Sequence, residues 1–159
     1  MLARWRYYFL SFLATIATAV AGSVASIQSQ SFYQEVERPS WAPPPQVFGP
    51  VWTVLYLMIA SSAGMALTAA PPERRAGMGV ILLIQFALNA LWTWIFFVWR
   101  NGALAFVDIF ALGLSIIVLI VLFWRFSKVA AAMLVPYLIW VSFAAALNFA
   151  IWRANPGML

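Results

Sequence analysis

Two amides occur in the middle of a long apolar stretch, where polar side chains are unexpected. Gln85 and Asn89 are followed by Trp92 and Phe96, and the spacings of four, three and four place these side chains on one face of a helix. An amide in an apolar surrounding needs a hydrogen-bond partner. The spacing fits two interpretations equally well: a polar anchor in a ligand cavity, or hydrogen bonds between helices, each worth about 0.6 kcal/mol on average.

Aromatic residues form similar faces on two other apolar stretches. Trp52 and Tyr56 lie four residues apart, and a longer stripe consists of Tyr137, Trp140, Ala144, Leu147 and Asn148. Together the three faces could enclose a flat, mostly apolar ligand, with rings for stacking and a few polar groups for orientation. The alternative is ordinary packing. Four further tryptophans stand at the ends of apolar stretches and fit the membrane interface instead: Trp5, Trp99, Trp124 and Trp152.

Asp108 is the only acidic residue inside an apolar stretch. A carboxylate at membrane depth is a candidate for function, here a polar or proton-carrying site. The alternative is a structural partner for a hydroxyl, an indole or Arg100. We favour the structural role, because a single acid without a basic partner in the membrane makes a poor proton relay.

The 159 residues include no cysteine and no histidine. Disulfides, thiolate nucleophiles, histidine acid–base catalysis and His or Cys ligation of metal or haem iron are therefore excluded. We expect no metal site, no catalytic residues of the usual kind and no required cofactor. The sequence favours a binding protein over an enzyme.

The composition is that of a membrane protein. Hydrophobic residues make up 65% of the chain and charged residues 8%, against roughly 45–50% and about 25% in soluble domains. The formal charge of +5 comes from nine basic and four acidic residues. The basic residues are scattered at the ends of apolar stretches and form no patch, so we expect a lipid bilayer as the partner and no nucleic acid.

Five apolar stretches predict an all-α, multi-pass integral membrane bundle with a single domain. Each has the ~20 residues needed to span the hydrocarbon core. The predicted helices cover residues 6–28, 47–70, 77–99, 102–124 and 129–152. The one long connection, residues 29–46, contains three consecutive prolines and is predicted to form a lid over one end of the bundle. The first stretch could instead be a signal peptide, but its apolar run is longer than the usual 7–15 residues, and we interpret it as a retained helix.

The basic residues also predict the orientation of the bundle. One side would carry Arg4, Arg6, Arg74, Arg75, Arg125 and Lys128, and the other Arg38, Arg100 and Arg153. The side richer in Lys and Arg is normally cytoplasmic. The N-terminus is therefore predicted to be cytoplasmic, with the long loop and the C-terminus on the opposite side.

Three sequence blocks closely resemble the tryptophan-rich sensory protein family, which includes the mitochondrial translocator protein, or peripheral-type benzodiazepine receptor. The first block runs from Arg38-Pro39-Ser40-Trp41-Ala42-Pro43-Pro44 through Val47-Phe48-Gly49-Pro50-Val51-Trp52-Thr53-Val54-Leu55-Tyr56. The second is Gln85-Phe86-Ala87-Leu88-Asn89 with Trp92, Phe96-Phe97 and Val107-Asp108. The third is Pro136-Tyr137-Leu138-Ile139-Trp140 through Leu147-Asn148 and Trp152-Arg153. The first helix and the second connection match weakly.

The resemblance implies a five-helix bundle, usually a homodimer, with a cavity closed by the first loop. The implied ligands are porphyrins such as protoporphyrin, other tetrapyrroles, isoquinoline carboxamides and benzodiazepines. The implied cavity residues are Tyr33, Trp41, Pro43, Trp52, Tyr56, Asn89, Trp92, Trp140, Ala144 and Leu147. Two positions depart from animal members. Phe149 replaces the tyrosine of the cholesterol-recognition pattern, which leaves cholesterol binding open, and Leu104 replaces a cavity tryptophan, which predicts reduced drug affinity.

Three functions are then in competition. The leading hypothesis is a membrane receptor or sensor for porphyrins that regulates tetrapyrrole or stress responses. The second is an enzyme that degrades porphyrin in light and oxygen, with indoles such as Trp52 or Trp140 as electron donors. The third is a transporter of tetrapyrroles or other lipophilic metabolites, for which Asp108 is the sole candidate for proton coupling.

Overall fold

The protein is a bundle of helices built from five membrane-spanning segments. The computed structural model describes the backbone of residues 2–159 and the side chains of all of these except residues 2–4, 28 and 30, so the Arg4 side chain lies outside the described part. Four spans are the helices α1 (Leu2–Ala25), α3 (Phe48–Ala69), α4 (Pro72–Thr93) and α5 (Gly102–Trp124). The fifth is divided into α6 (Lys128–Met133) and α7 (Val135–Ala154). All five segments are long and apolar enough to cross a membrane, which confirms the predicted all-α, multi-pass membrane fold.

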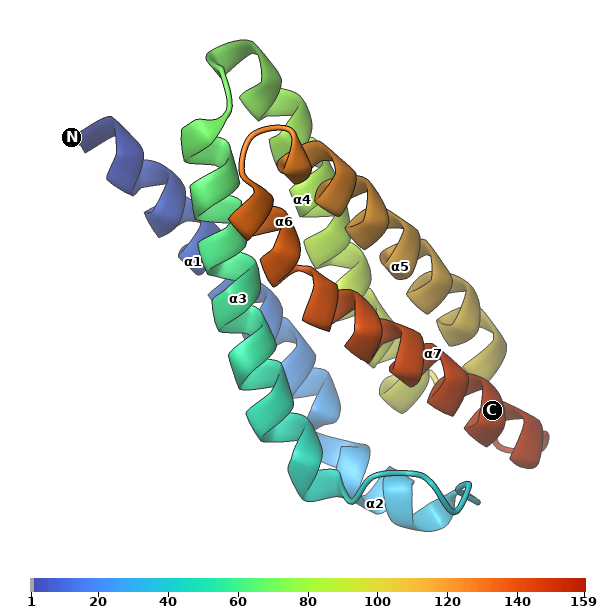
Figure 1. The fold of residues 1–159 in the computed structure, drawn as a ribbon. Helices are drawn as coiled ribbons and strands as arrows, with labels where there is room; N and C mark the ends of the chain where they lie inside the picture. Colours follow the sequence, from blue (N-terminus) through green and yellow to red (C-terminus); the bar gives the residue numbers. More distant parts are fainter. Residues whose placement is uncertain (1) are drawn as a thin grey trace.

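The spans form a closed ring rather than following their order in the chain. The first helix, α1, packs against α3 and α4, and α5 packs against α4, α6 and α7. The ring closes where α3 contacts α6 and, less extensively, α7. In Figure 1 the short helix α2 (Ser29–Glu35) lies at the lower end of the bundle, near the start of α3 and on the same end as the C-terminus.

The connection predicted as a loop at 29–46 is partly helical. A 3-10 turn at Ser26–Gln28 leads from α1 directly into α2, and another at Pro45–Val47 leads into α3. Only residues 36–44 lack helix or a 3-10 turn. The helix continues because it has an apolar face to bury: Phe32 is fully buried and its ring meets those of Phe96 and Phe97 edge-on, at 5.4 and 5.6 Å between centroids.

The third span starts earlier than predicted. Residues 71–75 are expected to form a turn, but α4 already begins at Pro72 and includes Glu73 and both arginines. Proline is favoured at the first helical position because its missing N–H would be unpaired there anyway. Glu73 in the first turn is favourable as well, because the N-terminal end of a helix carries partial positive charge.

The last span, expected to be continuous over 129–152, is interrupted at Leu134. Pro136 cannot donate the backbone hydrogen bond that would join the two helical pieces, and its ring crowds the carbonyl four residues earlier. A new helix, α7, therefore starts at Val135, with a proline in its first turn. The helix α4 is followed directly by a π-helical turn at Trp94–Val98.

Two glycines let helices approach closely. A Cβ at Gly64 of α3 would lie 2.5 Å from Cδ1 of Tyr8 in α1, and one at Gly102 would lie 2.7 Å from Cβ of Trp152. Small residues at such points allow helix backbones to come into direct contact in membranes. The Tyr8–Gly64 contact holds α1 and α3 together at the end of the bundle opposite α2.

Candidate ligand-binding site

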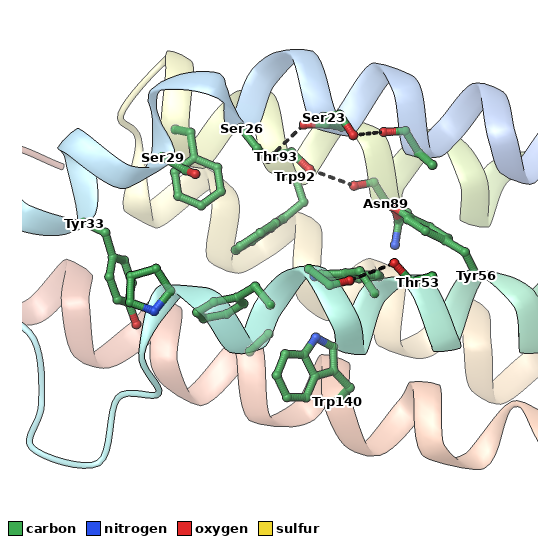
Figure 2. A pocket seen from close by; sticks show the side chains of 18 of the residues that line it. Ser23, Ser26, Ser29, Tyr33, Thr53, Tyr56, Asn89, Trp92, Thr93 and Trp140 are labelled. Atoms are coloured by element: carbon green, nitrogen blue, oxygen red, sulfur yellow. Dashed lines mark hydrogen bonds between the residues drawn. The ribbon is translucent and has the colours of Figure 1, made fainter.

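A cavity of about 620 Å³ opens between α1, α2, α3, α4 and α7 at the end of the bundle near α2. Figure 2 shows that its walls come from segments far apart in the chain: Ser23, Ser26 and Ser29 from one side, Thr53 and Tyr56 from α3, Asn89 and Trp92 from α4, and Trp140 from α7. Its volume lies within the range of about 300–1,000 Å³ of small-molecule sites. No charged side chain is among its described lining residues.

A hydrogen-bonded network orients the amide of Asn89 in the cavity wall. The Tyr56 hydroxyl donates to Asn89 Oδ1 at 2.9 Å, and Asn89 Nδ2 donates to the Tyr137 hydroxyl oxygen at 2.8 Å. Gln85 Nε2 donates to the same oxygen at 2.7 Å. Asn89 therefore fits both interpretations of the amide face, because it forms hydrogen bonds between helices and also lines the cavity. Gln85 does not line the cavity and fits only the second, a hydrogen bond between helices.

The aromatic walls are held by further contacts between helices. The rings of Trp52 and Tyr56 lie 5.3 Å apart, and Phe48 meets Trp140 edge-on at 5.9 Å. Trp92 Nε1 donates to Asn148 Oδ1 at 3.1 Å, and Asn148 Nδ2 in turn donates to the Gly102 carbonyl at 3.0 Å. Because its indole N–H is already bonded, Trp92 offers the cavity only its ring surface.

Trp140 differs from Trp92 in its hydrogen bonding. Its Nε1 is buried and has no hydrogen-bond partner among the described residues. The residue lines the cavity, and Figure 2 shows its ring extending from α7 toward α3. A buried donor without a partner is costly, so the indole N–H of Trp140 is an unpaired hydrogen-bond donor in a residue of the cavity wall.

The first helix contributes a wall, although its small residues predict close helix packing and no part in binding. Ala19, Gly22, Ser23 and Ser26 of α1 and the adjoining 3-10 turn line the cavity. The hydroxyls of Ser23 and Ser26 donate to carbonyls of their own helix, at 2.7 and 2.9 Å. The available signal was the spacing of three and four between small residues, which by itself indicates only close packing. Other lining residues that were not among the predicted cavity residues are Ser29, Pro45, Gln46, Phe48, Gly49, Thr53, Thr93 and Phe97.

Of the ten predicted cavity residues, seven line this one cavity: Tyr33, Trp52, Tyr56, Asn89, Trp92, Trp140 and Ala144. The other three lie outside the wall. Trp41 meets Phe143 edge-on at 5.8 Å, Leu147 is buried in the cluster around Phe32, and the Pro43 carbonyl accepts a hydrogen bond from Tyr33 at 3.3 Å. None of these three is among the residues that line the cavity.

Asp108 and Leu104, both in α5, do not line the cavity either. Asp108 is buried, and its Oδ2 has no hydrogen-bond partner among the described residues. The partner considered for it, Arg100, instead forms an ion pair with Glu35 at 3.2 Å. Leu104 is 45% exposed on the outside of the bundle.

The short helix α2 lines the end of the cavity through Ser29 and Tyr33, and a positive charge lies beside Tyr33. The guanidinium carbon of Arg38 lies 4.7 Å from the ring centroid of Tyr33, and Arg38 is exposed. Burial raises the pKa of Tyr33 above its ordinary value, and Arg38 only partly offsets this. The Tyr33 hydroxyl thus stays protonated at neutral pH and can donate to Pro43.

Fold and cavity together define a multi-pass membrane protein with an aromatic chamber inside the bundle. Residues 9–153 match the model of the TspO/MBR family. The chain is 38% identical to protein CrtK of Rhodobacter capsulatus over 89% of this chain and 90% of that protein. It is 40% identical to the tryptophan-rich protein TspO of Archaeoglobus fulgidus (91% and 94% covered) and 34% identical to the human translocator protein (79% and 76%). The chain belongs to the TspO/MBR family.

Proposed function

We propose that this protein is a membrane receptor that binds porphyrins and related tetrapyrroles in the cavity beside α2, and through them regulates tetrapyrrole or stress responses. The observation that carries the proposal is a chamber of about 620 Å³ walled by Trp52, Trp92 and Trp140, with no charged side chain among the lining residues that the structure describes. A tetrapyrrole presents a broad apolar disc, and indole faces suit such a surface. Benzodiazepines and isoquinoline carboxamides are smaller flat molecules with a carbonyl group. They would use the same indole faces of the site.

The polar groups of the site suit the edge of such a ligand. The unbonded indole N–H of Trp140 can donate to a carbonyl or carboxylate oxygen. Arg38, which lies over Tyr33 at the cavity end, can pair with a propionate. Because the chain has no histidine or cysteine, a metal-free ring is favoured over haem.

Titration of the purified protein with metal-free protoporphyrin, followed by tryptophan quenching, tests this proposal. Trp140→Phe removes the N–H and part of the stacking surface, so we expect affinity to fall by about tenfold, equivalent to ~1.4 kcal/mol. Trp99→Phe is the matched control, since Trp99 is 56% exposed and does not line the cavity. Equal affinities of the Trp140 and Trp99 variants would place the ligand elsewhere.

A second candidate is light-dependent porphyrin degradation, favoured by the presence of Trp52 and Trp140 in one wall. An indole would give an electron to the photoexcited porphyrin, and the porphyrin radical anion would add oxygen. Return of the electron to the indole radical cation would then leave a ring-opened porphyrin that carries both oxygen atoms. Under illumination, Trp52→Phe and Trp140→Phe should slow product formation while Trp99→Phe does not. Bleaching at the rate of free porphyrin in all three variants would remove this candidate.

We further propose that the α2 end faces away from the cytoplasm, in line with the excess of basic residues at the other end. The natural absence of cysteine makes the test direct. Ser40→Cys should react with an impermeant maleimide in whole cells, and Ser127→Cys should react only after lysis. If Ser127→Cys reacted in whole cells and Ser40→Cys only after lysis, the α2 end would face the cytoplasm instead. The expected homodimer stays a prediction.

A further inference from the structure

A second cleft of about 520 Å³ lies between the start of α4 and the end of α5. Its lining includes Glu73 and Arg74 of α4, and Leu122 of α5 with Arg125 just beyond it. Arg74 precedes Asn89 of the ligand cavity by fifteen residues on the same helix, about 22 Å at 1.5 Å per residue. The cleft is therefore at the opposite end of the membrane-spanning bundle, at the level of lipid headgroups.

The two arginines of this cleft are not engaged by other side chains of the described bundle. Arg74 and Arg125 are exposed, and neither forms an ion pair or a side-chain hydrogen bond within the part of the chain that the structure describes. Their basic neighbours are engaged: Arg75 donates to the Ala70 carbonyl and the Tyr7 hydroxyl, and Lys128 lies over Trp124. Two free guanidinium groups at one cleft attract an anion, and guanidinium suits a phosphate geometrically.

The inner surface of the same cleft is apolar. Met78 is 3% exposed and forms part of the lining together with the half-buried Leu122 and Phe126. From Leu122 the helical spacing of four leads along the outside of α5 to Val118 and Leu114, which are 44% and 51% exposed. A basic site followed by an apolar track suits an amphiphile and does not suit a free ion.

We propose that this cleft binds one anionic phospholipid of the surrounding bilayer, with its phosphate between Arg74 and Arg125 and an acyl chain along α5. Basic pockets between transmembrane helices bind anionic headgroups in this way. Glu73, the one acidic residue of the lining, repels further negative charge, so the site takes a lipid with a single phosphodiester charge. This inference does not depend on the function proposed for the other cavity.

Native mass spectrometry of the detergent-solubilised protein, titrated with phosphatidylglycerol, tests the proposal. Each arginine near a lipid headgroup contributes about fivefold in affinity, so Arg74→Gln with Arg125→Gln should weaken the tightest adduct by about 25-fold. Arg153→Gln is the matched control, an exposed arginine at the other end of the bundle. If Arg153→Gln weakens the lipid adduct as much as the double variant does, the lipid is held by general attraction to positive charge, and the proposal fails.

Three further arms identify the headgroup and verify folding. Glu73→Gln should tighten phosphatidylglycerol binding; if instead phosphatidylethanolamine is preferred and Glu73→Gln abolishes it, the site is zwitterionic and the proposal is overturned. Inorganic phosphate at millimolar concentration should not displace the lipid, and complete displacement would indicate a free-anion site. If the double variant binds protoporphyrin with unchanged affinity, it is folded. The weaker lipid binding is then a local effect of the two substitutions.

Discussion

The side chain of Asn155, just after α7, pairs with the backbone of Glu37, 118 residues earlier. Its Oδ1 accepts a hydrogen bond from the Glu37 N–H at 2.9 Å, and its Nδ2 donates to the Glu37 carbonyl at 3.0 Å. This amide ties the segment after α2 to the C-terminal end of the bundle. Its loss should free the segment that connects α2 to the 3-10 turn before α3.

Asn155→Ala is therefore expected to loosen residues 36–44. Removing the pair costs about 1 kcal/mol per hydrogen bond, so backbone amide exchange in this segment should accelerate by about tenfold or more. Hydrogen exchange by mass spectrometry measures it. Asn155→Asp keeps the acceptor for the Glu37 N–H and should show an intermediate effect. Equal protection in all three proteins would show that other contacts hold the segment.

Tyr137→Phe tests the network behind the cavity. The change removes the oxygen that accepts hydrogen bonds from both Gln85 and Asn89. Leaving buried donors unpaired costs about 1–3 kcal/mol each in soluble proteins, and membrane values are lower. We expect a loss of about 1–3 kcal/mol in the free energy of unfolding, measured by denaturation in mixed micelles. Tyr56→Phe, which removes one donor to Asn89, should lose less; the opposite ranking would contradict the network.

Gly64→Ala tests the contact between α1 and α3. The added methyl would lie 2.5 Å from the Tyr8 ring, so the helices must separate or the ring must move. We expect destabilisation of about 1–3 kcal/mol from overpacking. Gly113→Ala is the control, because nothing lies within 4 Å of its new Cβ. That variant should be neutral or more stable by up to about 1 kcal/mol, since alanine favours helix. Thermal unfolding followed by circular dichroism distinguishes the two.

Arg100 combines a strained backbone with an ion pair. Its φ is 51°, in the left-handed region, and its guanidinium pairs with Glu35 at 3.2 Å. Both side chains are over 40% exposed, so the pair is worth at most about 1 kcal/mol. Arg100→Ala loses the pair and keeps the strain, whereas Arg100→Gly relieves the strain. The glycine variant should unfold at a higher temperature than the alanine variant; the reverse order would show that strain at this residue is negligible.

The sequence predicted the parts of this structure that depend on composition and helical period. Apolar runs of sufficient length indicated the spans, and the spacing of Trp52, Tyr56, Asn89 and Trp140 indicated faces that meet. It did not predict α2, because the apolar face of Phe32 becomes useful only when Phe96 and Phe97 are already in place. The division between α6 and α7 was visible in Pro136 but outweighed by the surrounding apolar run.

The wall formed by α1 was missed for a different reason. Ser23 and Ser26 carry no aromatic or amide group, and their hydroxyls bond to their own helix. Their small side chains leave space for the cavity. In the sequence, this pattern of small residues is the same as that of a close helix contact. Trp41 and Leu147 were assigned to the wall by the family resemblance; neither lines it, because Trp41 is half-exposed and Leu147 is buried in the cluster around Phe32.

The Tyr8–Gly64 contact has a consequence for ligand range. It joins α1 and α3 about 21 Å along α1 from Gly22, where the same two helices stand apart around the void. A tilt of α1 about this contact would change the distance between α1 and α3 at the cavity. The side-chain volumes at positions 8 and 64 are therefore expected to affect the width of the cavity.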